Sequence, residues 1–109
     1  MPYGALEKRA TVIDNLRKDH QNILLLDSGD MLGRRPDKRR HQHIIEAYRA
    51  MNYDAIALGD YDFVEGPEFL LDNFFGLGNL VNTNVEYLGL TIGNPFIIKE
   101  KAGLKIGIT

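Results

Sequence analysis

Two short apolar runs, each leading to a Gly-Asp pair, constrain the fold of this chain more than any other feature of its sequence. The first run covers residues 23–26 and leads into Asp27-Ser28-Gly29-Asp30, and the second covers residues 55–58 and leads into Gly59-Asp60. Continuous apolar runs of this length predict strands that are buried on both faces, as in a parallel sheet. A helical pattern precedes each run, so the order helix, strand, helix, strand predicts an α/β fold.

The two long helices are predicted from apolar residues at helical spacing. The first is expected over residues 5–19, and its inner stripe is Leu6, Ala10, Ile13 and Leu16. The second is expected from Asp37, which suits an N-cap, to Met51, and Asn52 closes it. Its inner stripe is Ile44, Ile45, Tyr48 and Met51.

The second half of the chain predicts shorter elements. A short helix is expected after Gly66-Pro67, burying Phe69, Leu70 and Phe74. Residues 80–85 are expected to form a third strand, followed by a loop that reaches Phe96. Residues 96–99 and 104–108 then predict a β-hairpin around Lys101-Ala102-Gly103. A chain that ends inside an apolar strand leaves a sheet edge open, which suggests truncation of a longer parent.

Composition excludes several classes of protein. With 44% hydrophobic and 26% charged residues, the chain lies outside the range of disordered segments. Its net charge of -2 and the absence of a nucleic-acid motif argue against a nucleic-acid partner. The chain has no cysteine, which excludes disulfides, zinc fingers and thiol catalysis. No apolar run approaches the ~20 residues that a membrane span needs, so no membrane partner is expected.

Acidic residues follow both predicted strands at the point where parallel sheets bind ligands. Asp30 and Asp60 are expected at two strand ends, where their carboxylates would hold a divalent cation. Asp27, Asp37 and Asp62 lie near enough in sequence to add oxygen ligands. On spacing alone, the alternative that Gly and Asp simply form turns at strand ends is favoured.

Six segments, in this order, resemble the 5'-nucleotidase family of calcineurin-like metallophosphoesterases: residues 4–13, 24–30, 51–60, 82–85, 95–99 and 103–108. They cover nearly the whole chain, and an ordered set is far more specific than a single motif. The resemblance implies a partial metallophosphoesterase-like α/β sandwich, with βαβ units followed by a β-hairpin. Residues 1–109 are accordingly expected to form one partial domain.

Members of this family hold two divalent ions, Mn, Zn, Mg or Fe, roughly 3.5 to 4 Å apart, which clamp a phosphate and activate a water. The resemblance implies that Asp30 stands where a carboxylate bridges both ions. In the family's next motif, Gly-Asn-His-Glu or Gly-Asn-His-Asp, the Asn binds one metal and an Asp three residues beyond the His orients that His. Here Asp60 replaces the Asn and keeps a metal-binding oxygen, whereas Tyr61 and Val64 replace the His and its Asp.

This double replacement predicts a chain without the family's proton-handling pair, so no catalytic residue is assigned. A phenol with an ordinary pKa near ~10 is a poor proton donor at neutral pH, and valine cannot orient a neighbour. The family's Asp-X-His motif lies upstream of the matching region and its later histidines lie downstream, which leaves Asp30 and Asp60 as metal ligands. The isolated chain is therefore expected to bind metal weakly or not at all, and to be inactive.

Other polar residues are interpreted as surface residues. His20 is expected to terminate the first helix, while His41 and His43 lie two apart on the second helix and should face different directions. Surface roles are favoured for all three histidines. A basic cluster is interpreted as a solvated loop and helix start rather than an anion site. It consists of Arg34, Arg35, Lys38, Arg39 and Arg40.

The leading interpretation is a fragment of a 5'-nucleotidase-like phosphoester hydrolase, whose parent acts on a phosphoester or nucleotide. The alternative is a non-catalytic binding or interaction module of phosphoesterase ancestry. A receiver-like domain with Asp27 as phosphoacceptor is disfavoured, because the chain shows no suitably placed strand-end lysine. Relatives are often exported, so the resemblance implies a periplasmic or secreted parent. Exposed sheet edges near residues 23–26 and 96–108 would be covered by self-association.

Overall fold

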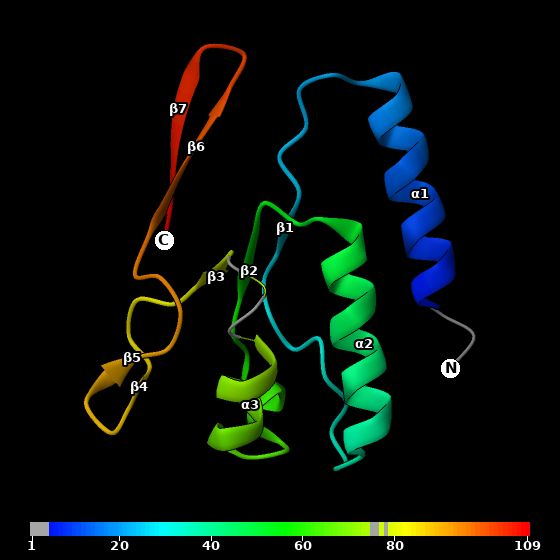
Figure 1. Cartoon of the computed structure of the whole chain (residues 1–109). Helices are drawn as coiled ribbons and strands as arrows, with labels where there is room; N and C mark the ends of the chain where they lie inside the picture. Colours follow the sequence, from blue (N-terminus) through cyan, green and yellow to red (C-terminus); the bar gives the residue numbers. More distant parts are fainter. Residues whose placement is uncertain (1–4, 75–76, 78) are drawn as a thin grey trace.

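The computed structural model describes residues 5–74, 77 and 79–109. In this part of the chain, three α-helices and a short 3₁₀ helix accompany a small parallel sheet, and two β-hairpins follow it (Figure 1). The helices are α1 (Leu6–Asp19), α2 (Lys38–Met51) and α3 (Pro67–Phe74), and the 3₁₀ helix η1 covers Asp60–Phe63. The architecture is the mixed α/β fold that the sequence predicts.

The parallel sheet consists of β1 (Leu26–Asp27), β2 (Ala55–Ala57) and β3 (Leu80–Val81), in the order β1-β2-β3. β2 is the central strand, and its Ile56 is completely buried. The expectation that residues 23–26 form a strand buried on both faces is wrong. β1 covers only Leu26 and Asp27, lies at the edge of the sheet and leaves half of the Leu26 surface exposed.

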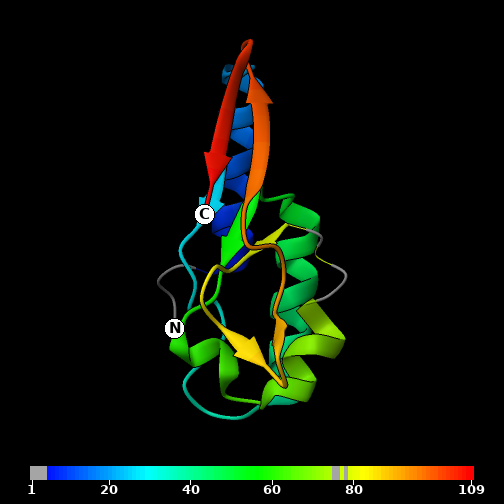
Figure 2. The same ribbon diagram turned by 90° about the vertical axis from the view of Figure 1, so that its left-hand side faces the viewer.

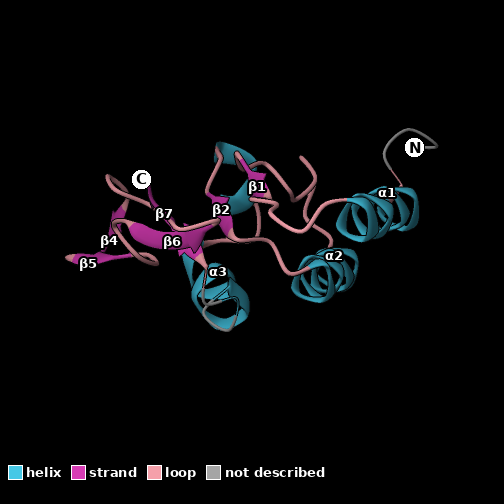
Figure 3. Cartoon of the chain, turned by 90° about the horizontal axis from the view of Figure 1, so that it is seen from above, coloured by secondary structure: helices cyan, strands magenta, loops and turns pink. Residues whose placement is uncertain are grey.

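The helix α2 packs against both α1 and α3, which Figure 3 shows from above. It begins as predicted, since Asp37 Oδ1 accepts the backbone N–H of Arg40 at 3.1 Å, and it ends at Asn52 in the left-handed conformation. The predicted inner stripe of α2 is confirmed for its buried members Ile45, Tyr48 and Met51. No helix in the described ranges combines the length and apolar character needed to cross a membrane.

The predicted stripe of α1 extends one turn too far. Ile13 is buried, but Leu16 keeps 45% of its surface exposed. The C-terminal turns of α1 reach past the end of α2 (Figure 1), so α2 does not extend beside them. The helix ends at Asp19, with His20 as its C-cap, as the sequence suggests for His20.

The third strand is shorter than the predicted residues 80–85 because Asn82 turns the chain. Asn82 Nδ2 donates to the carbonyl oxygens of Val85 and Ile92 at 2.7 and 3.1 Å, and its Oδ1 accepts the N–H of Val85 at 3.0 Å. The segment predicted as loop contains a small hairpin, β4 (Glu86–Tyr87) and β5 (Leu90–Thr91). Strands of this length are too short to show a period of two in the sequence.

The predicted C-terminal hairpin is confirmed as β6 (Ile97–Lys101) and β7 (Leu104–Ile108). The turn residues Ala102 and Gly103 have φ values of 51° and 77°, the left-handed values that a two-residue hairpin turn of type I′ requires. Figure 2 shows the hairpin extending beyond the parallel sheet. Lys99 and Lys101 reach back to the Asp54 carboxylate, with Nζ–Oδ1 distances of 3.9 and 3.8 Å.

Candidate functional site

The loops that follow β1 and β2 meet at the carboxyl end of the sheet, where the sequence predicts a carboxylate site. Asp30 lies in the loop after β1, and Asp60 begins η1 shortly after β2. Asp30 Oδ1 accepts the backbone N–H of Tyr61 at 3.0 Å, so the structure places Asp30 against the start of η1. Both aspartates are exposed to solvent. We call this edge the Asp30–Asp60 rim.

The glycines of the two Gly-Asp pairs allow the loops of the rim to touch. A Cβ atom on Gly29 would lie 2.6 Å from the backbone nitrogen of Gly59, and one on Gly59 would collide with the Asp30 carboxylate. Gly29 and Asp30 both have positive φ values, 103° and 60°. Aspartate is one of the few residues with a side chain that visit this region readily. The Gly-Asp pairs therefore form turns and also bring two segments distant in sequence into contact.

Asp62 holds both loops of the rim in place. It is completely buried, and its Oδ2 accepts the backbone N–H groups of Gly59 and Asp30, each at 2.9 Å. Its Oδ1 accepts the N–H of Leu32 at 3.1 Å. Burial raises the pKa of the Asp62 carboxyl, although these three N–H donors favour the ionised form. Asp62, suggested by the sequence as an added oxygen ligand, instead binds the backbone of the rim.

Asp27 belongs to a network that joins β1 to both long helices. Its Oδ1 accepts the N–H of Gly29 at 2.9 Å, and its Oδ2 accepts the Tyr48 hydroxyl at 2.9 Å. Arg9 of α1 donates to the same hydroxyl and lies 3.7 Å from Asp27 Oδ2. Burial and the adjacent Asp27 charge raise the pKa of Tyr48, so its phenol remains a neutral donor. Both carboxylate oxygens of Asp27 are thus engaged within the fold.

The prediction of a surface role is wrong for His41 and holds for the exposed His20 and His43. His41 is 1% exposed, its Nε2 accepts the backbone N–H of Gly33 at 3.0 Å, and its Nδ1 lies 3.2 Å from Glu65 Oε2. The loop after Asp30 lies against His41 on the inner face of α2. His41 thus supplies the acceptor that the backbone N–H of Gly33 needs. His41 and His43 do face different directions, as their spacing predicts.

The donor set of the described residues does not by itself fit a metal centre. Across the described ranges, no group of three or more His, Asp or Glu side chains is placed to hold an ion. Asp27 and Asp62 direct their oxygens into the fold, and Asp37 caps α2. The assignment of Asp30 and Asp60 as metal ligands therefore stays a prediction.

Tyr61 and Val64, to which the resemblance assigns the family's His and Asp positions, have different surroundings. The guanidinium carbon of Arg34 lies 5.0 Å from the centroid of the Tyr61 ring, a cation–π geometry at the edge of the rim. Val64 follows η1 and packs against the hydrophobic core. Val64 thus contributes to packing, and the Tyr61 ring contacts the Arg34 guanidinium.

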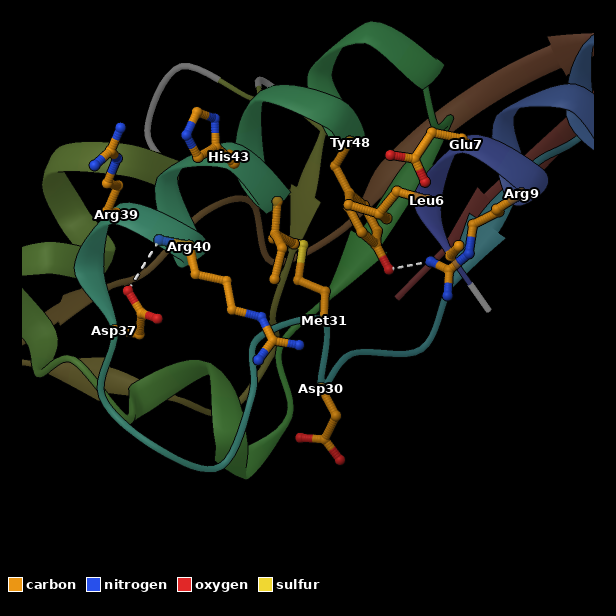
Figure 4. A pocket seen from close by; sticks show the side chains of 12 residues that line it. Leu6, Glu7, Arg9, Asp30, Met31, Asp37, Arg39, Arg40, His43 and Tyr48 are labelled. Carbon is orange, nitrogen blue, oxygen red and sulfur yellow. Dashed lines mark hydrogen bonds between the residues drawn. The ribbon is translucent and has the colours of Figure 1, made fainter. Parts of the chain in front are cut away.

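A groove with a volume of about 770 Å³ lies beside the rim, between the first turns of α1 and α2 (Figure 4). Asp30 and Met31 form part of its wall. All five residues of the basic cluster are exposed, as expected for a solvated loop and helix start, but Arg39 and Arg40 also line this groove. Sequence reasoning missed it, although the spacing of Arg39, Arg40 and His43 puts them on one side of α2.

Comparison with known proteins identifies relatives of this chain. No family model matches it. A snake venom 5'-nucleotidase of Crotalus adamanteus is 30% identical over 116 residues, which cover 97% of this chain and 20% of that protein. The snake venom 5'-nucleotidase of Naja atra is 36% identical over 72 residues, which cover 64% of this chain and 14% of that protein.

A bacterial relative extends the comparison beyond venom proteins. The trifunctional nucleotide phosphoesterase YfkN of Bacillus subtilis is 30% identical over 112 residues, which cover 88% of this chain and 8% of that protein. The chain therefore spans a fifth or less of the length of these three curated relatives.

Proposed function

Because this chain belongs to the 5'-nucleotidase family of metallophosphoesterases, we propose that it forms part of a phosphoester hydrolase domain. In this proposal the Asp30–Asp60 rim supplies two carboxylates to a divalent-metal site, and the remaining ligands come from outside the chain. The main support is that Asp62 and Tyr61 hold Asp30 at the carboxyl end of the sheet through backbone hydrogen bonds. The relatives' names indicate nucleotides as the substrate class of the whole protein.

We further propose that the chain alone does not turn over phosphoesters. The resemblance assigns Tyr61 and Val64 to the positions of the proton-handling pair, and Val64, which packs against the core, has no group that accepts or donates a proton. The same replacement supports the second candidate, a non-catalytic binding or interaction module. A module without metal affinity would show no stabilisation by metal, since only a ligand that binds the native state raises its apparent stability.

Manganese distinguishes these candidates. Because two carboxylates alone bind a divalent ion weakly, millimolar Mn²⁺ is expected to raise the midpoint of thermal unfolding of the chain only slightly. Asp30→Asn is expected to abolish that rise, because the variant keeps an acceptor for the Tyr61 N–H but loses the charge. Asp72→Asn, at an exposed position, is the matched control. In the same samples, hydrolysis of 4-nitrophenyl phosphate is expected to stay at background. A missing thermal shift would favour the binding module, and robust turnover would contradict the inactivity of the chain.

We also propose that the exposed sheet edges support self-association. β1 is an edge strand with a half-exposed Leu26, and Ile98 and Leu104 of the C-terminal hairpin keep 62% and 65% of their surfaces exposed. Apolar side chains beside unpaired strand edges favour pairing with another chain. Sedimentation velocity is expected to show a concentration-dependent increase in mass that Ile98→Lys reduces. A strict monomer at high concentration would rule this proposal out.

A further inference from the structure

The groove beside the rim has the size of a ligand site. Its volume of about 770 Å³ lies within the range of roughly 300–1,000 Å³ that is usual for small-molecule sites. Its walls come from three segments that are distant in sequence: the first turns of α1, the loop at Asp30 and Met31, and the first turns of α2. A concave surface built from separate elements can contact several parts of one ligand.

Of the three arginines that line this groove, Arg9 and Arg40 extend into it from opposite walls, whereas Arg39 points away from Met31 and Asp30 (Figure 4). Arg9 extends from α1 and is already engaged by the Tyr48 hydroxyl and by Asp27. Arg40 extends from α2 toward Met31 and Asp30, yet within the described residues no carboxylate lies within ion-pair distance of its guanidinium. Arg40 is therefore a cation without a counter-ion among the described residues, inside a concave surface.

Three acidic residues, Glu7, Asp30 and Asp37, line the groove, and none of them forms an ion pair with Arg40. Asp37 lines it, but its Oδ1 caps α2 by accepting the N–H of Arg40, so the amino end of α2 is already occupied by a carboxylate. The arginine side chains that line the groove remain as donors for an anion there. A guanidinium presents parallel N–H donors that match two oxygens of a phosphate, which makes Arg40 suited to that role.

Apolar side chains lie between the two cations. Leu6 of α1, Met31 of the loop and Ile44 of α2 all line the groove. A fully ionic ligand such as inorganic phosphate would leave this surface in water, whereas an organic group would cover it. The groove thus combines an apolar surface with a guanidinium that forms no ion pair among the described residues.

From this combination we infer that the groove between α1 and α2 binds an organic phosphate monoester, whose phosphate is held by Arg40 and whose organic group lies on Leu6, Met31 and Ile44. The ligand class rests on the proposed function, because the groove shares Asp30 with the rim. The proposed contact between Arg40 and the phosphate involves no metal, so it can be tested separately from the metal-binding proposal.

Phenyl phosphate is the probe, titrated into the whole chain in the presence of EDTA and followed by amide chemical shifts in nuclear magnetic resonance. Shifts are expected around the groove, and Arg40→Gln is expected to weaken binding about tenfold, because a charge-assisted bidentate contact is lost. Arg40→Lys is expected to recover only part of that loss, since it restores the charge without the planar fork. Inorganic phosphate is expected to bind more weakly than phenyl phosphate, because it leaves the apolar surface uncovered.

Arg35→Gln is the matched control, because Arg35 is exposed, belongs to the same basic cluster and does not line the groove. It is expected to change affinity by less than about twofold. Equal affinity of Arg40→Gln and the unsubstituted chain, or an equal loss in Arg35→Gln, would overturn the inference. The phenyl phosphate titration contains EDTA and is therefore independent of metal. If manganese causes no thermal shift but binding of phenyl phosphate depends on Arg40, only the metal-binding proposal is refuted. If manganese causes the shift but binding does not depend on Arg40, only the proposed ligand site in the groove is refuted.

Discussion

Replacing Asp62 by asparagine is expected to lower the free energy of unfolding by about 2–3 kcal/mol. Three backbone N–H groups, from Gly59, Asp30 and Leu32, converge on the two carboxylate oxygens of this buried residue. An asparagine offers one acceptor oxygen and an amide group that itself donates. At least one buried N–H would therefore face another donor and lose its partner.

Urea unfolding followed by circular dichroism measures this change, and Asp72→Asn serves as the control. Asp72 is exposed, so removing its charge is expected to alter the free energy of unfolding by less than about 0.5 kcal/mol. If Asp62→Asn were as stable as Asp72→Asn, the three hydrogen bonds would not be what holds the two loops together.

Replacing Gly59 by alanine is expected to cost about 2–3 kcal/mol, in the upper range for inserting a methyl group where there is no space. The added Cβ would collide with the Asp30 carboxylate and lie 2.7 Å from the Asp30 backbone nitrogen. The side chain of Asp30 can rotate, but its backbone is held by Asp62. The φ value of Gly59, -108°, is allowed for alanine, so the cost arises from packing and not from backbone conformation.

Gly107→Ala is the matched control for this substitution. Gly107 lies in β7 without a positive φ, and a Cβ atom added to it would meet no other atom within 4 Å. Its replacement is expected to leave the free energy of unfolding unchanged or slightly raised, since alanine restricts the unfolded chain. The manganese-induced thermal shift is expected to disappear in Gly59→Ala and to persist in Gly107→Ala. Similar stabilities of the two variants would show that the loops separate without strain.

Both predictions concern the same property of the rim. The position of Asp30 depends on backbone hydrogen bonds to Asp62 and on the absence of a side chain at Gly59. A carboxylate that is held in advance loses less side-chain entropy when it binds a ligand. Asp62 and Gly59 thus control the position of the exposed Asp30 carboxylate.

Most regular elements could be predicted from the sequence because their cause is local. The apolar spacing of residues 37–51, the capping carboxylate of Asp37 and the proline at the first position of α3 each act over one or two helical turns. The C-terminal hairpin was similarly visible from two apolar segments around a short turn. The predictions fail where contacts between segments distant in sequence decide the outcome. Leu16 keeps nearly half of its surface exposed in the last turns of α1, and Asn82 ends the third strand through hydrogen bonds to a later segment.

The amino-acid sequence by itself determined the order of the three α-helices, the strands of the parallel sheet and the C-terminal hairpin, the placement of Asp30 and Asp60 after strand ends, and the resemblance to phosphoesterases, since all of these depend on residue type and spacing. Only the tertiary structure decided that Asp62 and His41 bind backbone in the interior, and that Arg40 faces a groove shared with Asp30. The physical reason is that hydrogen-bond satisfaction and charge compensation depend on groups that are distant in sequence, and folding alone brings them together.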